Sequence, residues 1–405
     1  MKKIAFLILT LTLYFPAHVS AATNYYVSPT GSDTNAGTAA APFKTISKGM
    51  TVAQPGDTVY LGPGTYPSVV ISKSGTASAP ITIRGNQAII SGGTVVLSVT
   101  GSYLIISGIE VTNAVSHGLH ITGKHITLSD FSVHDNVTEN KKTDGSCGNI
   151  VGGGWGSGLS IKYGSDDIQV TNGLLYHNCG EGMAATRALN VRVSGMTSYD
   201  NFSANLYIDN SINVTLSDSF AYCTPNSNFY RDGQLGTGIL IGEEYYSGWG
   251  AQLENIQILN NISFKCKGIN FYGAEVSPGG LVGALIANNT IWDVYNGGRA
   301  INISAQPNNS NIVIRNNVAA GAISTGTGIT VSNNQTTAIF QTTPTYNINS
   351  FCLAPNSPGF GVNGYQCGTT TPPTIKQIIL DYLKNSPASD LNHDGKVNII
   401  DAFWL

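Results

Sequence analysis

The stretch "DIQVTNGLLYHN" (residues 167–178) and the later stretch "NVRVSGMTSYDN" (190–201) decide the fold. Each joins a short apolar/polar alternation to a polar corner and a second apolar pair. The same order recurs at 125–136, 213–223, 255–266 and 311–321. Each unit also carries an alternating tetrad, as in "GLSI" (158–161), "NLYI" (205–208) and "GILI" (238–241). The chain is therefore an internal repeat of roughly 23 to 32 residues, which predicts a solenoid.

Strict alternation sends one side of every strand inward, so each unit is expected to form one turn of the solenoid. Three short strands per turn, with Ile, Leu and Val inward and Asn or Gly at the corners, predict an all-β right-handed parallel β-helix. The many β-branched residues and the 47 glycines argue against a helical-repeat solenoid. A β-sandwich would need hairpin signals, which are few.

Composition and the first residues indicate an exported protein. Residues 1–22 have two lysines, an apolar run and small residues before the cleavage point, which is typical of a signal peptide. We expect a secreted protein, periplasmic or attached to the cell surface as alternatives, and no membrane span. Only 11% of residues are charged and the net charge is −3, which argues against a nucleic-acid partner. The β-helix domain is predicted over 23–367.

Six cysteines in an exported chain make disulfides possible. Cys352 and Cys367 close a short loop and are the favoured pair. Two further pairs are open because their members fall at comparable loop positions of adjacent coils, namely Cys147 with Cys179 and Cys223 with Cys266. Connectivity does not follow from sequence alone.

The beginning of the predicted domain resembles a known group of proteins. "NYYVSPTGSDTNAGTAAAPFKTISKGMTVAQPGDTVYLGPGTY" (24–66) resembles the opening of secreted β-helix proteins of the pectate-lyase and chondroitinase type. The resemblance covers most of residues 24–340. It implies a short helix at about 43–53 that plugs the end of the core, and a first coil that begins at "PGDTVYLGPGTY". It does not specify the reaction, because β-helices host lyases, hydrolases, epimerases and inert adhesins.

The candidate site comes from reading equivalent positions on successive coils, which lie about 4.8 Å apart. One outward column of the tetrad sheet is Ser160, Ala184, Tyr207, Leu240 and Asn270, and the next is Lys162, Thr186, Asp209, Gly242 and Tyr272. Charged residues flank these columns, at Glu181, Arg187, Asp200, Glu243 and Glu244. Two long loops, 137–157 and 224–237, project from the same edge, and the first carries Trp155. This cluster is expected to line a groove that binds a polysaccharide.

The resemblance implies roles for these residues. In such lyases a calcium ion held by carboxylates neutralises a uronate, and a lysine or arginine removes the proton α to the carboxyl group. Lys162 is the base candidate, with Arg187 as a neighbouring charge that lowers its pKa. Glu181 and Tyr207 complete the catalytic set. The candidate calcium ligands in the groove are Asp200, Asp209, Glu243 and Glu244.

Other functions stay open on the sequence. A glycoside hydrolase needs two carboxylates about 5 to 9.5 Å apart, which Glu181, Asp209 and Glu243 can supply. An epimerase on the same fold is a further possibility, and so is a non-catalytic glycan-binding or surface protein. The chain has no contiguous catalytic signature of lyases or epimerases. On the resemblance and the cluster of site residues, we expect a monomeric polysaccharide lyase that acts on an acidic glycan. The other functions stay open as alternatives.

A second polar cluster falls at one corner of consecutive coils. "VHDN", "YHN" and "YDN" place His134, Asp135, His177 and Asp200 there, which permits a metal or acid/base site. The favoured interpretation is structural, namely a corner ladder in which Asn residues satisfy backbone groups. Its members are Asn136, Asn178 and Asn201.

The sequence pattern after residue 367 differs from that of the repeats. "GTTTPPT" (368–374) is a Thr/Pro linker, and 375–387 has the apolar spacing of a helix. The loop that follows has oxygen ligands at EF-hand spacing: Asp390, Asn392, Asp394, Lys396 through its carbonyl, Asn398 and Asp401, with Gly395 at the turn. Residues 375–405 resemble one segment of a dockerin, whereas a complete dockerin has two. The resemblance implies calcium binding and a cohesin-type scaffold partner.

Overall fold

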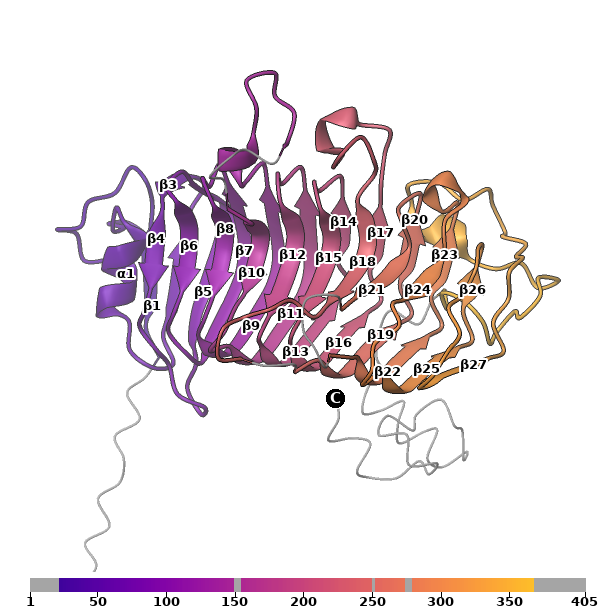
Figure 1. Ribbon diagram of the computed structural model, residues 1–405. Helices are drawn as coiled ribbons and strands as arrows, with labels where there is room; N and C mark the ends of the chain where they lie inside the picture. Colours follow the sequence, from indigo (N-terminus) through magenta and orange to yellow (C-terminus); the bar gives the residue numbers. More distant parts are fainter. Residues whose placement is uncertain (1–21, 149–153, 250–251, 274–278, 368–405) are drawn as a thin grey trace, which may run out of the picture.

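The structure, a computed structural model, describes residues 22–148, 154–249, 252–273 and 279–367. The predicted linker and calcium segment lie outside these residues, as does the predicted signal peptide apart from Ala22. All pairings between named strands are parallel, and they form two sheets (Figure 1). No helix among the described residues is long and apolar enough to cross a membrane.

The smaller sheet has nine strands in the order of the chain. They are β4 (Val69–Ile71), β6 (Val95–Val99), β8 (His117–Ile121), β10 (Ser157–Ile161), β12 (Glu181–Thr186), β15 (Ala204–Asp209), β18 (Thr237–Gly242), β21 (Ile269–Tyr272) and β24 (Ile301–Ile303).

The larger sheet has eighteen strands. They are β1 (Asn24–Val27), β2 (Thr58–Leu61), β3 (Gly64–Pro67), β5 (Ile81–Ser91), β7 (Leu104–Thr112), β9 (Lys124–His134), β11 (Asp166–Tyr176), β13 (Leu189–Ser194), β14 (Thr197–Tyr199), β16 (Ile212–Ser217), β17 (Phe220–Tyr222), β19 (Glu254–Leu259), β20 (Ile262–Phe264), β22 (Val282–Ala287), β23 (Thr290–Trp292), β25 (Ser310–Arg315), β26 (Val318–Ala319) and β27 (Ile329–Ser332).

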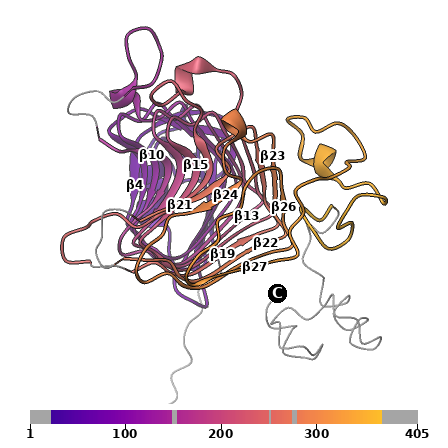
Figure 2. The same ribbon diagram turned by 45° about the vertical axis from the view of Figure 1, so that its right-hand side comes forward.

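Each coil from β12 onward consists of three strands. The first coil is β12, β13 and β14, the next is β15, β16 and β17, and the series continues in this way to β24, β25 and β26. In earlier coils the second and third strands merge into one long strand, as in β9 and β11. The predicted parallel β-helix with three short strands per turn is therefore confirmed, and Figure 2 shows the coils nearer to end-on.

The core is a stack of apolar ladders inside the coil. Leu159 on β10 pairs in register with Met183 on β12, which pairs with Leu206 on β15, and all three are fully buried. Ile, Leu and Val continue the ladders from the first coil to the last. Each fully buried Leu or Ile side chain contributes about 1.5 to 3 kcal/mol by leaving water, so the repeated alternation accounts for the cylinder.

A helix, α1 (Ile46–Val52), lies at the N-terminal end of the cylinder, within the range expected from the sequence (Figure 1). Thr45 caps it by accepting a hydrogen bond from the Lys48 N–H. Its buried residues Ile46 and Met50 belong to the main core. Gly49 permits close packing, because a Cβ there would lie 2.9 Å from the Val59 side chain.

Residues 336–367 lie beside the last coils rather than within them (Figure 2). Phe351 and Tyr365 from this segment pack against Phe264 on β20 in a separate apolar cluster. The disulfide between Cys352 and Cys367, predicted from their spacing, closes the segment. The two pairs that the sequence left open are also present, Cys147 with Cys179 and Cys223 with Cys266.

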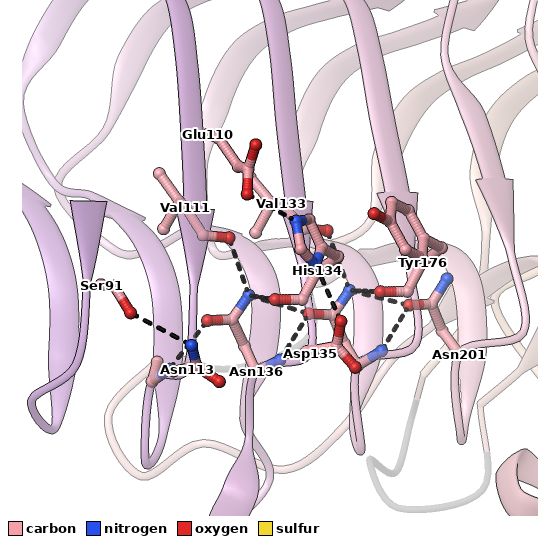
Figure 3. Close-up of polar contacts among 12 residues, drawn as sticks. Ser91, Glu110, Val111, Asn113, Val133, His134, Asp135, Asn136, Tyr176 and Asn201 are labelled. Atoms are coloured by element: carbon pink, nitrogen blue, oxygen red, sulfur yellow. Dashed lines mark hydrogen bonds and ion pairs between the residues drawn. The ribbon is translucent and has the colours of Figure 1, made fainter. Parts of the chain in front are cut away.

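An asparagine ladder fixes one corner of the coil (Figure 3). The Asn136 side chain donates to Asn178 Oδ1 at 3.0 Å, and the Asn178 side chain donates to Asn201 Oδ1 at 2.9 Å. Backbone N–H groups of Asn136 and Asn178 donate to the same oxygens. The structural interpretation of this corner is therefore confirmed.

The neighbouring His134 is held by carboxylates rather than poised for chemistry. Its ring nitrogens lie 2.8 Å from Asp135 and 3.2 Å from Glu110, and the ring stacks on Tyr176 (Figure 3). Both carboxylates raise the pKa of His134, against the effect of burial. No group of three or more His, Cys, Asp or Glu side chains within the described ranges is arranged to hold a metal ion.

We predict that Asn178→Ala destabilises the protein by about 3 kcal/mol, because buried donors on the preceding coil lose their acceptor. Urea unfolding followed by circular dichroism measures the change. Asn349→Ala is the matched control, since Asn349 is an exposed asparagine outside the ladder. Equal stability of the two variants would show that the ladder does not hold the corner together.

Candidate functional site

A cavity of about 580 Å³ opens on the outward face of the nine-stranded sheet. It lies over β10, β12, β15 and β18, where the sequence analysis placed the groove. Its lining combines acids, bases and aromatic rings: Trp155, Lys162, Glu181, Ala184, Thr186, Ser203, Tyr207, Arg231, Leu240, Glu244, Tyr246 and Tyr272. Four of the predicted site residues are thus brought together, namely Lys162, Glu181, Tyr207 and Glu244.

The strand register that was read from the sequence is confirmed. Ala184 pairs with Tyr207 and Thr186 with Asp209. Lys162 directly follows Ile161, which pairs with Ala185. Lys162 therefore stands one coil before Thr186 and two coils before Asp209.

Lys162 is a half-buried base with little direct pairing. Its ammonium donates one hydrogen bond, to Thr186 Oγ1 at 3.4 Å, and no carboxylate among the described residues lies within 4.0 Å of it. Burial lowers the pKa of Lys162 most, and the positive charge of Arg187 lowers it further. Glu181 and Asp209 act in the opposite direction, but the net pKa lies below the usual lysine value.

Glu181 is a buried acid that lines the same cavity. It begins β12, and its Oε2 accepts a hydrogen bond from Ser157 Oγ on the preceding coil at 3.1 Å. Burial raises the pKa of Glu181, against the lowering effect of Lys162. The Ser157 N–H also donates to His117 Nδ1, and burial beside Lys162 lowers the pKa of His117 to about 4.

Two carboxylates and two phenols form a closed network at the edge of the cavity. Asp209 Oδ2 accepts a bond from the Tyr246 hydroxyl at 2.5 Å, and its Oδ1 accepts one from the Glu244 N–H at 3.2 Å. Glu244 in turn accepts from the Tyr207 hydroxyl at 2.9 Å and from Tyr246 at 3.3 Å. Burial raises the pKa of Asp209 to about 7 and raises the pKa of both tyrosines.

Gly242 makes room for the Tyr207 ring. A Cβ at this position would lie 2.3 Å from the Tyr207 hydroxyl oxygen, so only glycine lets the ring lie across β18. The ring is almost wholly buried and contributes its face to the cavity lining.

Arg187 lies behind this network rather than in the cavity lining. Its guanidinium stands 4.4 Å from the centre of the Tyr246 ring and 5.3 Å from that of Tyr163. The Trp249 ring is the third aromatic ring around this guanidinium, and its indole N–H donates to the Asn210 carbonyl at 3.1 Å. Arg187 therefore lies outside the cavity lining, and its positive charge lowers the pKa of Lys162.

The two long loops form one wall of the cavity. The Cys147 N–H donates to the Asn228 carbonyl at 2.7 Å, which ties the loops together. Arg231 lies over the Trp155 ring at 4.6 Å and donates to Ser203 Oγ at 3.2 Å. The disulfides of Cys147 and Cys223 fix the loops to adjacent coils.

Two predicted calcium ligands do not reach the cluster. Asp200 accepts both the N–H and the hydroxyl of Thr224, at 2.7 and 2.6 Å, at the asparagine corner. Glu243 accepts the Gly280 N–H and lines a different hollow. The Glu243 side chain is directed away from the cavity by the alternation of the strand. Glu243 follows Gly242 and therefore points away from the face that Glu244 and Asp209 share.

The groove does not offer the donor set of a calcium site. Calcium takes six to eight oxygen ligands that are free to coordinate. Asp209 and Glu244 are the only two predicted ligands that meet, and their oxygens already accept hydrogen bonds from Tyr207, Tyr246 and the backbone. Within the described residues, no larger group of candidate ligands accompanies them.

Several residues of the site had no role predicted from the sequence. Arg231 and Tyr246 lie in loops, where no strand register indicates the direction of a side chain. His120 was missed although a signal existed, since it pairs with Ser160 and thus extends the first column by one coil. Burial lowers the pKa of His120, and the positive charge of Lys162 lowers it further.

The fold is thus a parallel β-helix with a charged hollow on its nine-stranded sheet. A family profile described as "Pel9A-like, right handed beta helix region" matches residues 25–351. The chain therefore belongs to the Pel9A-like right-handed β-helix family.

Curated relatives include two pectate lyases. The chain is 46% identical to pectate lyase PEL9 of Emericella nidulans over 84 residues, which are 19% of this chain and 20% of the relative. It is 30% identical to pectate lyase L of Dickeya chrysanthemi over 137 residues, which are 28% and 31% of the two chains. The alignments thus span a fifth to a third of these relatives.

Among solved structures, pectate lyase Pel9A superposes with a TM-score of 0.62 at 21% identity. The superposition covers 84% of this chain and 91% of that one. At this identity the likeness bears on the fold alone.

We predict that Asp209→Asn flattens the pH dependence of stability between about pH 4 and pH 7. The folded-state pKa of Asp209 is raised to about 7, whereas an unfolded aspartate titrates near 3.9. Its stabilising contribution is therefore complete below about pH 4 and is lost as pH rises to about 7. Urea unfolding across this range measures the effect.

Asp232→Asn is the control for this comparison, since the Asp232 side chain is 83% exposed. The free energy of unfolding should fall with pH more steeply in the wild type and in the control than in Asp209→Asn. Parallel curves for all three proteins would contradict the buried, protonated state of Asp209.

Proposed function

We propose that the protein is an exported polysaccharide lyase that cleaves a uronate-containing glycan in the groove over β10, β12, β15 and β18. The observation that carries the proposal is Lys162, a half-buried lysine with a lowered pKa on the wall of a cavity that also holds Glu181 and Arg231. Membership of a family with pectate lyase relatives supports the reaction class. Three disulfides support an oxidising, extracellular location.

The proposed chemistry is β-elimination. The neutral amine of Lys162 removes the proton α to the uronate carboxyl group, and the C–H electron pair forms a carbon–carbon double bond as the bond to the glycosidic oxygen breaks. Glu181, whose pKa burial raises, is the group that supplies a proton to the leaving oxygen. Proton removal and proton supply are then carried by two groups of one cavity.

The remaining residues bind and orient the sugar. Arg231 lines the cavity with its guanidinium toward Trp155, and it pairs with the uronate carboxylate in place of a metal ion. Tyr207 gives the sugar a ring surface, with its hydroxyl fixed on Glu244. The calcium assistance expected from the resemblance takes no part in these steps, because the donor set in the groove does not fit it.

A glycoside hydrolase is the second candidate. The observation that favours it is that two carboxylates, Glu181 and Glu244, line the same cavity, and Glu181 has the raised pKa of a general acid. An epimerase and a non-catalytic glycan-binding protein have no comparable support.

The C-terminal segment 375–405 lies outside the described residues. Its calcium site, formed by Asp390, Asn392, Asp394, Lys396, Asn398 and Asp401, and a cohesin-type partner stay predictions from the sequence.

We predict that the protein generates an unsaturated, ultraviolet-absorbing product from polygalacturonate, alginate or chondroitin, and that Lys162→Ala lowers the rate between about 10²- and 10⁴-fold. Lys162→Gln should fail similarly, because a carboxamide cannot accept the proton. Lys124→Ala is the control, since the Lys124 side chain is 55% exposed and begins β9 in the eighteen-stranded sheet, outside the cavity lining. Assays in calcium and in a chelator show whether a metal is required.

The product decides between the candidates. New reducing ends without absorbance would replace the lyase by the hydrolase. Binding without turnover of any of the three glycans would leave a glycan-binding protein.

A second prediction concerns the charge of Arg187. Its removal in Arg187→Met should raise the pKa of Lys162 and move the rising limb of the pH profile of kcat/KM to higher pH. Arg192→Met, at an exposed arginine, should leave the profile unchanged. A loss of activity at all pH values with an unmoved limb would instead indicate a purely structural role for Arg187.

A further inference from the structure

The groove extends beyond the cavity toward the C-terminal coils. A second hollow of about 310 Å³ shares Ser203, Arg231 and Leu240 with the cavity. A third, of about 350 Å³, shares Gln234 and Lys267 with the second and reaches Arg299. The three hollows therefore form one continuous depression along the axis of the coil.

Positive charge accumulates along this extension. Lys267 stands two residues before Ile269, and Arg299 stands two residues before Ile301, the in-register partner of Ile269. The two cations thus occupy the same position on adjacent coils, about 4.8 Å apart along the axis. Arg231 is close enough to Lys267 to lower its pKa, in addition to burial.

These charges have little compensation within the chain. Among the described residues, Lys267 and Arg299 have no carboxylate within 4.0 Å, and Arg231 has only the highly exposed Asp232 at 3.9 Å. Three clustered cations are notable in a chain with 20 Lys and Arg against 23 Asp and Glu. Neighbouring like charges destabilise a fold unless a counter-charge arrives, so the cluster is suited to an anionic ligand.

The floor of the extension supplies hydrogen-bonding groups. Asn270 and Asn302 pair in register and line the third hollow beside the two cations. On the other side of Lys162 the same sheet carries His117 and His120, whose pKa values are lowered. The cations of the groove therefore lie on the C-terminal-coil side of Lys162.

We infer that Lys267 and Arg299, with Asn270 and Asn302 beneath them, form an anion-binding strip for the acidic groups of successive sugars on the C-terminal-coil side of Lys162. The strip would hold the glycan along the axis of the coil, because the spacing between successive coils is about the spacing between successive sugar rings. This inference rests on the proposed function only in placing a polysaccharide in the groove. Its ligand chemistry is a carboxylate or a sulfate on consecutive sugars.

The test measures binding rather than turnover. Affinity electrophoresis in the Lys162→Ala background compares polygalacturonate, chondroitin sulfate and a neutral galactan at several salt concentrations. The double variant Lys267→Gln/Arg299→Gln should bind an acidic polymer at least tenfold more weakly at low salt, with a shallower salt dependence, and should bind galactan unchanged. Weaker binding of the double variant to polygalacturonate would show that the strip binds carboxylates. Weaker binding to chondroitin sulfate alone would show that it binds sulfates.

The matched control is Lys44→Gln/Arg315→Gln, which removes the same charges at exposed positions outside the groove. It should bind like its parent. Unchanged affinity of the groove variant for both acidic polymers, or an equal loss on galactan, would overturn the strip. Absence of an unsaturated product with the wild type would instead overturn only the lyase reaction, because this readout does not need turnover.

Discussion

The hydrogen bonds between successive coils, kept in one parallel register, are the constraint on which the rest of the structure depends. They hold equivalent residues of neighbouring coils in line, with about 4.8 Å between them. Buried asparagines at the corners enforce that register, because each side-chain oxygen accepts hydrogen bonds from the coil before it. A shift by one residue would turn every inward side chain outward.

The same register builds the site. It aligns Lys162, Thr186 and Asp209 on one face, and it sets Glu181 one coil beyond Ser157. The walls then remove water from these groups, which lowers the pKa of Lys162 and raises those of Glu181 and Asp209. A charge-poor chain thus concentrates its reactive groups in one hollow, while its cations continue along the groove.

The sequence predicted what the register determines. The repeat gave the three-stranded coil and the order of the columns. Of the three disulfides, only the pair Cys352–Cys367 was favoured from the sequence, and the other two pairs were left open. The sequence did not predict the positions of side chains that depend on loop conformation. Arg231 and Tyr246 owe their places to loop conformation, and Glu243 is turned away from Glu244 by one step of alternation. The expected calcium site in the groove depended on where four carboxylates point, and two of them hold Thr224 and Gly280 instead.

The central claim is that burial in the groove makes Lys162 a base, and its titration tests this most directly. Nuclear magnetic resonance of lysine side chains labelled at the ε-carbon, with Lys162→Arg to assign the signal, gives the pKa of this one amine. The account predicts a midpoint clearly below those of the exposed lysines of the same protein. A midpoint equal to theirs would contradict it.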